Sequence, residues 1–206
     1  MRIERIEKSK HKQERVLVFL EGGDLLRITG AELLRFGLYK GMDLSPALVV
    51  ELQAAAQQSQ LKQTAARMAS GRMLSKKEVQ RRLTKKGATE EQAADTADWL
   101  ETLGAVDDEG YAGVIVRHYG AMGYGPGRVK QELHRRGVPR ELWDEALERA
   151  EDPAEAIDAF LAKKLGDTPP EDRRAWKRAS DALARRGYAW SDISEGLRRY
   201  GAEWEE

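Results

Sequence analysis

Three glycines spaced 50 residues apart constrain this chain more than any other feature of its sequence. Gly87, Gly137 and Gly187 each follow two basic residues, and a leucine stands four positions before each glycine. The flanks keep the same offset, with apolar residues at i, i+4 spacing before each glycine and again after it. That spacing is typical of one helix face, and glycine commonly ends a helix in a left-handed conformation. The pattern predicts helix–glycine–helix units in tandem.

One more apolar helix is expected upstream of each helix pair, at about residues 60–71, 108–120 and 153–165. A three-helix unit of about 45–50 residues buries little apolar surface alone, so neighbouring units should pack together. We therefore predict a mainly α chain, an elongated array of three tandem three-helix repeats. The repeats are expected over residues 59–105, 106–150 and 151–206, the last with an acidic tail.

The first 58 residues have a different pattern. Apolar and β-branched runs flank a Gly22-Gly23 turn, which predicts a small hairpin or meander of strands. Thr29 and Glu32 have the spacing of a capping box, so a short helix should follow and stop at Gly37. Ser45-Pro46 predicts another helix start. A small strand-containing region with short helices is expected here.

Composition and motifs argue against catalysis. The 206 residues include 35 basic and 35 acidic side chains and no cysteine, which excludes disulfides, thiolate metal sites and a cysteine nucleophile. The glycine cluster at 123–127 lacks the strand that a phosphate-binding loop needs, and the Asp107-Asp108 pair is expected to cap a helix. We predict no enzymatic activity, no metal and no cofactor.

The chain is also expected to be a cytoplasmic monomer. Its longest dense apolar run, Val16–Leu20, is far shorter than the roughly 18 residues of a membrane span. No long heptad seam for self-association is visible. We therefore expect a soluble protein without a membrane partner.

Basic residues recur on the helix that precedes each glycine. With Val79 and Leu83 on the buried stripe of the first such helix, the neighbouring cations should lie off that stripe. Such a face suits an acidic protein surface or a phosphate backbone, and an ordinary solvated helix face explains it as well. The candidate partner-binding residues are Lys76, Lys77, Arg81, Arg82, Lys85, Lys86, Arg128, Lys130, Arg135, Arg136, Arg185 and Arg186.

Aromatic residues give no separate functional signal. Trp99 and Trp143 fall at helical spacing beside other apolar residues, which favours core packing. No segment alternates aromatic and basic residues in the way a single-strand stacking platform does.

Particular motifs resemble the RecX regulatory proteins. The segment Leu74-Ser75-Lys76-Lys77-Glu78-Val79, with Leu83 and Lys86-Gly87, is similar to the first RecX repeat. The segment from Gly125-Pro126-Gly127 to Gly137-Val138 resembles the second. The likeness spans roughly residues 60–200 and is most specific at about 70–150. The third block departs at Trp176 and Ala179, and depends on Leu183, Gly187 and the offset of 50.

The resemblance implies a modulator of the RecA recombinase. A RecX-like protein would bind along the RecA–DNA filament and damp ATP hydrolysis, strand exchange and the coprotease activity of the DNA-damage response. The alternative is a stand-alone DNA-binding helical module whose cations contact phosphates. Direct contact with single- or double-stranded DNA stays open in both hypotheses, although the neutral net charge favours the first.

Overall fold

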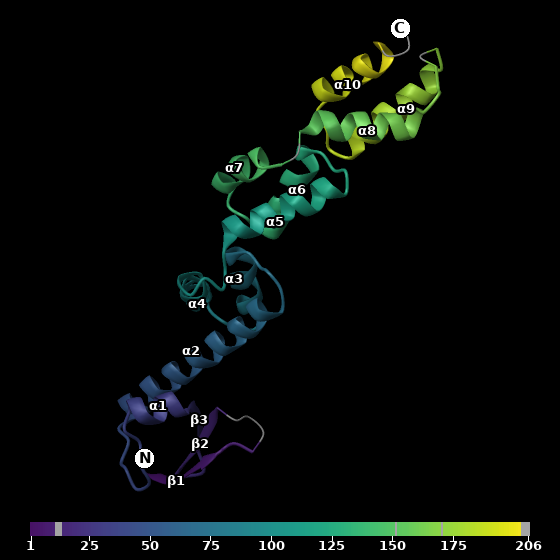
Figure 1. Cartoon of the computed structure of the whole chain (residues 1–206). Helices are drawn as coiled ribbons and strands as arrows, with labels where there is room; N and C mark the ends of the chain where they lie inside the picture. The colour runs from purple at the N-terminus through teal and green to yellow at the C-terminus, as the bar shows by residue number, and fades with distance from the viewer. Residues whose placement is uncertain (11–13, 151, 170, 203–206) are drawn as a thin grey trace. The chain divides into compact units, whose positions relative to one another are not determined.

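The computed structural model describes residues 1–10, 14–150, 152–169 and 171–202 (Figure 1). The expected acidic tail, residues 203–206, lies outside the described residues. The chain divides into two compact units. The first comprises residues 1–71 and 80–102, and the second comprises residues 72–79 and 103–206.

The N-terminal region of the first unit is a three-stranded antiparallel sheet in the order β1-β2-β3. The strands are β1 (Ile3–Lys8), β2 (Arg15–Leu20) and β3 (Leu25–Thr29). Gly22 and Gly23 both have positive φ in the turn between β2 and β3, as the sequence predicts. One sheet face is buried against Val49 and Leu52, so the sheet and the following helices share one core.

The predicted capping box starts α1 (Gly30–Arg35). The Thr29 amide donates to Glu32 Oε2 at 2.6 Å, and the Glu32 amide donates to Thr29 Oγ1 at 3.4 Å. Gly37 follows with φ of +59°. The Ser45 hydroxyl then accepts from the Leu48 amide at 3.1 Å at the start of α2 (Pro46–Gly71).

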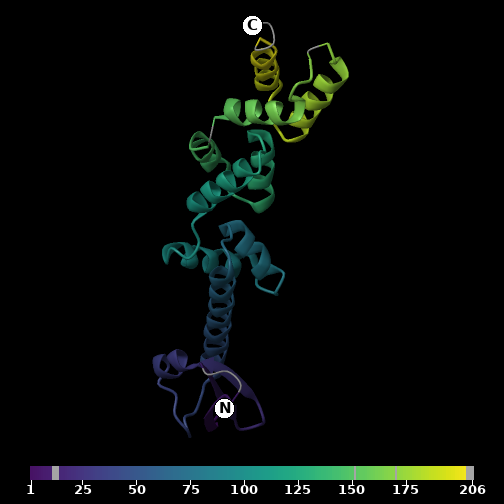
Figure 2. The same ribbon diagram turned by 45° about the vertical axis from the view of Figure 1, so that its right-hand side comes forward.

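The helix expected at about 60–71 is present as the end of a longer helix. The expected domain boundary at residue 58 falls inside that helix and stays a proposal. Residues 46–71 form the single helix α2, visible as one uninterrupted coil in Figures 1 and 2. No glycine or proline interrupts the chain between Pro46 and Gly71, and the segment is rich in strong helix formers such as Ala and Gln. The boundaries at 105 and 150 fall between helices, and we retain them as a proposal.

The glycine repeat ends three helices in the same way. These helices are α3 (Lys76–Thr84), α6 (Pro126–Arg136) and α9 (Arg173–Arg185). Gly87, Gly137 and Gly187 have φ of +94°, +74° and +90°. The amide that follows each glycine donates to the carbonyl of the leucine five residues earlier, at 3.0–3.3 Å. The 50-residue offset therefore preserves a helix stop in which glycine takes the left-handed turn.

The helices on either side complete the repeats. The ones that follow are α4 (Glu90–Thr102), the 3-10 turn η1 (Arg140–Leu142) with α7 (Trp143–Glu148), and α10 (Trp190–Ala202). The ones that precede α6 and α9 are α5 (Asp108–Ala121) and α8 (Pro153–Leu165). Leu133 anchors the core of α5, α6 and α7, and Leu183 that of α8, α9 and α10. The prediction of a mainly α chain with helical repeats and a small N-terminal sheet is confirmed.

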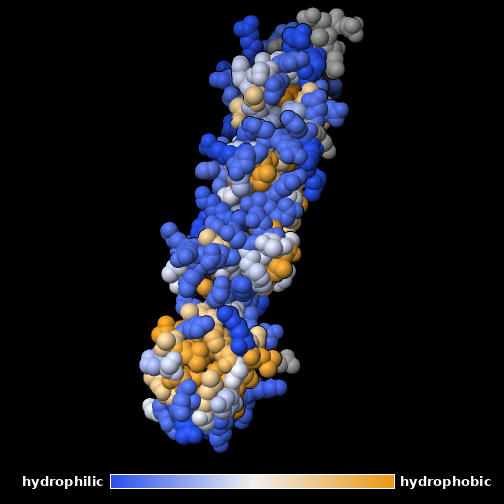
Figure 3. All heavy atoms as spheres, turned by 90° about the vertical axis from the view of Figure 1, so that its left-hand side faces the viewer, coloured by the Kyte–Doolittle hydropathy of each residue, from blue (hydrophilic) through white to orange (hydrophobic). Residues whose placement is uncertain are grey.

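The first unit also carries apolar surface. Figure 3 shows apolar side chains gathered over its N-terminal region, at the bottom of the view. Leu34 of α1 and Val50 of α2 are 82% and 65% exposed. Among the described residues, no helix combines the length and the apolar character needed to cross a membrane.

Candidate partner-binding surface

Helix α3 and the two residues after it, Lys85 and Lys86, carry half of the predicted cations. Val79 and Leu83 are fully buried, which confirms the predicted stripe. Arg82 and Lys76 are half-buried, and the Lys76 amide donates to Asp108 Oδ1 at 2.9 Å. The other four cations are exposed and form no ion pair within the described part of the chain: Lys77 and Arg81 on α3, and Lys85 and Lys86 after its end.

Helix α6 surrounds one buried carboxylate with three cations. Arg135 donates to Glu132 Oε2 from two nitrogens, at 2.9 and 2.6 Å. Arg128 and Arg136 lie 3.5 and 3.8 Å from the same carboxylate. The fourth cation of the helix, Lys130, pairs with Asp144 at 3.4 Å. Two carboxylates thus compensate half of the positive charge predicted for this helix and position all four cations.

Opposing influences set the ionisation of Glu132. Burial alone favours the neutral acid, but hydrogen bonds from Arg135 and Tyr119 and the nearby positive charges outweigh it, so the pKa of Glu132 is lowered. The hydrogen bond to Glu132 in turn raises the pKa of Arg135. Glu132 thus stays ionised and fixes its cationic neighbours.

The basic residues directly before Gly137 and Gly187 lie at joints between repeats. The Ser75 hydroxyl, which caps α3, donates to the carbonyl of Arg136 at the end of α6. Fifty residues on, the Gly125 amide at the start of α6 donates to the carbonyl of Arg186 at 2.9 Å. The end of each later helix therefore meets the start of the earlier one, so opposite ends of the two helix dipoles face each other.

The two arginine side chains are also held by contacts within the protein. Arg136 donates to the Tyr111 hydroxyl at 2.6 Å, and its own pKa is raised despite partial burial, because it is hydrogen-bonded to Tyr111. The Arg186 guanidinium lies 4.8 Å from the centre of the Phe160 ring and donates to the Gly123 carbonyl at 3.3 Å. Both arginines are half-buried. The Arg186 side chain links the third repeat to the second through Gly123, whereas the Arg136 side chain stays within the second repeat and only its carbonyl reaches Ser75.

The predicted set of twelve cations thus separates into groups. Arg186 bonds across a joint, Arg136 is held by Tyr111 within its own repeat, and Arg128, Lys130 and Arg135 are paired with carboxylates. Arg185 is exposed and has no ion pair within the described residues, like four cations of α3 and the turn after it. Sequence reasoning missed Glu132 as the organising group, although basic residues four before, three after and four after it were a readable signal.

The predicted caps around the candidate surface are present. The Asp107 side chain accepts from the Gly110 amide at 2.9 Å and caps α5, while its neighbour Asp108 reaches the start of α3. Thr89 and Gln92 exchange hydrogen bonds at 3.1 and 3.2 Å at the start of α4. Trp143 packs in the core of the second repeat, with its indole donating to the Val138 carbonyl at 3.0 Å.

Comparison with known proteins agrees with this architecture. Residues 107–147 match the family description "RecX, second three-helix domain", and residues 150–197 match "RecX, third three-helix domain". The regulatory protein RecX of Stenotrophomonas maltophilia is 35% identical over 115 residues, which cover 55% of this chain and 71% of that protein. The one from Pseudomonas putida is 29% identical over 129 residues, covering 62% of this chain and 83% of its own.

Solved structures give the same fold. A crystal structure of regulatory protein RecX superimposes with a TM-score of 0.75 at 23% identity, over 94% of this chain and 98% of that one. The structure of RecX from Lactobacillus salivarius gives 0.62 at 22% identity, over 69% and 95% of the two chains. The former match extends the likeness of fold well beyond the two matched three-helix domains.

Proposed function

This chain belongs to the RecX family of regulatory proteins, and we propose that it binds the filament that the RecA recombinase forms on DNA. Bound there, it would inhibit or modulate the ATPase, recombinase and coprotease activities of that filament, acting as a non-catalytic, cytoplasmic monomer. The observation that carries the proposal is the 35% identity to the RecX protein of S. maltophilia over 71% of that protein.

The exposed cations supply the proposed contact. Arg81 lies on α3 and Lys85 directly after it, and Arg185, two offsets of 50 residues after Lys85, ends α9 of the third repeat. None of the three has an ion pair within the described residues. Tandem repeats that each make a weak contact gain affinity from their high effective concentration once one repeat is bound. Repeated helices of this kind suit a polymer of identical protomers.

The alternative of a stand-alone DNA-binding helical module receives less support. Phosphate contacts need cations that are free to neutralise the backbone. On α6, Arg128 and Arg135 already pair with Glu132, and Lys130 with Asp144. Fewer cations therefore remain on these helices than the sequence predicts.

The test is ATP hydrolysis by RecA on an excess of single-stranded DNA, with this protein well below one molecule per protomer. Excess DNA prevents simple competition for the strand from mimicking inhibition. Progressive loss of hydrolysis supports the proposal, whereas unchanged hydrolysis at equimolar protein and low salt contradicts it.

A charge reversal tests the contact residues. Arg81→Glu with Lys85→Glu should weaken inhibition about tenfold, since each exposed ion pair contributes up to about 1 kcal/mol. The matched control is Lys163→Glu with Lys164→Glu, which reverses two exposed lysines on α8. Equal inhibition by both double variants would show that the α3 cations are not the contact.

A further inference from the structure

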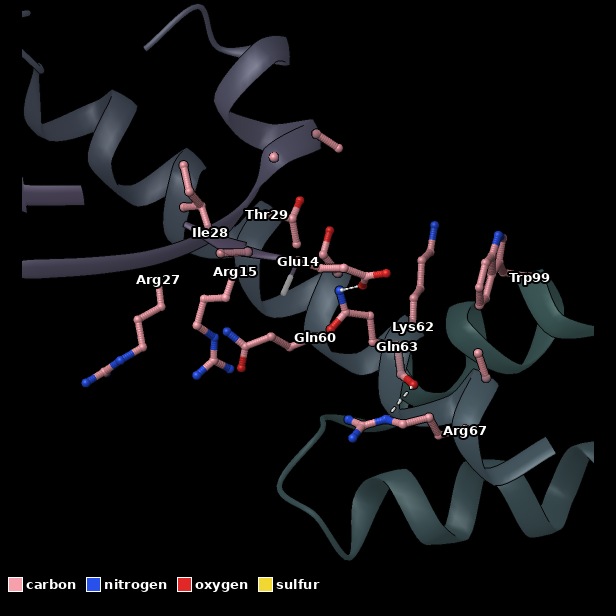
Figure 4. Close-up of a pocket in the computed structure, with 15 residues that line it drawn as sticks. Glu14, Arg15, Arg27, Ile28, Thr29, Gln60, Lys62, Gln63, Arg67 and Trp99 are labelled. Carbon is pink, nitrogen blue, oxygen red and sulfur yellow. Dashed lines mark hydrogen bonds between the residues drawn. The ribbon is translucent and has the colours of Figure 1, made fainter. Parts of the chain in front are cut away.

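The first compact unit contains a groove that the proposed function does not use. It lies between the strands β2 and β3, the middle of α2, and α4, and its volume is about 1140 Å³ (Figure 4). Every lining residue belongs to this one unit. The groove is much larger than a cavity for one ion, so it has room for an extended or bulky molecule.

The groove is lined by four cations and one carboxylate. Arg15 and Arg27 come from β2 and β3, and Lys62 and Arg67 come from α2. Within the described residues none of the four forms an ion pair. The carboxylate is Glu14, which accepts from the Gln63 side-chain amide at 3.0 Å. The groove therefore presents uncompensated positive charge.

The two strand arginines show that the charge is concentrated. In the sheet, Arg15 pairs with Thr29 and Leu17 pairs with Arg27, so the two arginines are diagonal neighbours on one face. Diagonal neighbours lie within reach of long side chains, and like charges placed so close repel each other. Figure 4 shows them side by side at one end of the groove. An anion between them would remove that repulsion.

An aromatic ring stands at the other end. Trp99 of α4 lines the groove and is half-buried, so its expected core position is only partly realised. The Lys62 ammonium lies 5.1 Å from the centre of its ring. In Figure 4 the two side chains extend in the same direction. The lining therefore combines several cations with an aromatic face, and these two features bind single-stranded nucleic acid.

We propose that this groove binds single-stranded DNA, with Arg15, Arg27, Lys62 and Arg67 on the phosphates and Trp99 stacked on a base. The α2 residues that line it run from Ala56 to Arg67, about 16 Å of helix, which accommodates a few nucleotides. The site is independent of the recombinase contact. No sequence segment alternates aromatic and basic residues, because four separate elements supply this set.

The first test is binding to a labelled oligothymidylate of about 15 nucleotides, with no recombinase present. The salt dependence of this binding tests whether the four cations contact phosphates. Four phosphate contacts predict a slope of log affinity against log salt of about −2.8, which is an affinity loss of about 50-fold from about 50 to 200 mM salt. The variant Arg27→Ala/Arg67→Ala should halve the slope, so that the same change in salt costs only about sevenfold. Both arginines are exposed, so the fold should tolerate the change.

The control variant Lys163→Ala/Lys164→Ala removes two exposed cations from α8 and should keep the wild-type slope. Wild-type affinity and slope in the Arg27/Arg67 variant would overturn the proposal. Because recombinase is absent, this result is separate from success or failure of the ATPase test.

Fluorescence tests the stacking contact. Binding should quench Trp99, and Trp99→Phe should remove that part of the signal while keeping most of the affinity. Trp99→Ala should bind at least about fivefold more weakly, the effect of losing one base stack. Tighter binding of a duplex of equal length, or equal binding of polyglutamate without quenching, would assign the groove to a different occupant and overturn the proposal.

Discussion

The joint between the second and third repeats should tolerate no side chain at Gly187. A Cβ atom there would lie 2.3 Å from the backbone nitrogen of Arg128, closer than real Cβ atoms approach. The Gly187 carbonyl also accepts from the Gly127 amide at 2.9 Å, so the clash falls on a hydrogen-bonded backbone contact. Gly187→Ala must therefore move one helix end away from the other.

Gly87 provides the matched control. Its φ of +94° is close to the +90° of Gly187, but a Cβ atom there would meet nothing within 4 Å. Left-handed backbone costs alanine about 1–2 kcal/mol, partly offset by the lower entropy of the unfolded chain. We expect Gly87→Ala to lose about 1 kcal/mol of unfolding free energy. Overpacking should add about 1–3 kcal/mol for Gly187→Ala.

Urea denaturation of both variants measures the difference, and amide hydrogen exchange locates it. The Gly127 amide should exchange faster than in wild type in Gly187→Ala, and at the wild-type rate in Gly87→Ala. Gly104→Ala adds a control inside the second unit, because its φ is +66° and its Cβ position is also open. Equal destabilisation by the Gly187 and Gly87 variants, with unchanged exchange at Gly127, would refute the assignment of a close-packed joint.

Two further predictions concern the buried polar groups. The pKa of Glu132 is lowered in the folded protein, so its stabilising effect is complete above the ordinary value of 4.5 and is lost as pH falls through the lowered value. Urea denaturation of Glu132→Gln across that acid range should show a weaker pH dependence than wild type, and parallel curves would contradict this. Ser75→Ala should cost about 1–2 kcal/mol of unfolding free energy, since the hydroxyl caps α3 and also donates to Arg136. The control is Ser70→Ala, at an exposed serine. If Ser75→Ala lowers the melting temperature no more than Ser70→Ala does, the Ser75 contact at the joint is unimportant for stability.

Local signals in the sequence predicted most of the secondary structure. Gly87, Gly137 and Gly187 end their helices because only a residue without a side chain takes a left-handed turn at little cost. The capping box of Thr29 is also a local signal, because its partner Glu32 is only three residues away. The continuity of α2 was also readable, because no helix breaker follows Pro46 before Gly71.

The candidate site was less predictable, because its decisive partners are distant in the sequence. Arg136 bonds to Tyr111, 25 residues earlier, and Arg186 reaches Gly123, 63 residues earlier. A basic pair before a glycine has the same pattern whether its second member faces water or a neighbouring repeat. For Trp99 the error ran the other way. Its helical spacing beside apolar residues predicted a core position, but in the structure it is half-exposed beside Lys62.

The joints have a consequence for the order in which the protein can fold during synthesis. Ser75 needs the carbonyl of Arg136, which the ribosome adds 61 residues later. At about 5–20 residues per second, the start of α3 waits about 3–12 seconds for its partner. The start of α6 waits equally long for Arg186. Each repeat is therefore completed by the one translated after it, and a nascent chain stalled before Arg186 would expose the unmatched start of α6 to water.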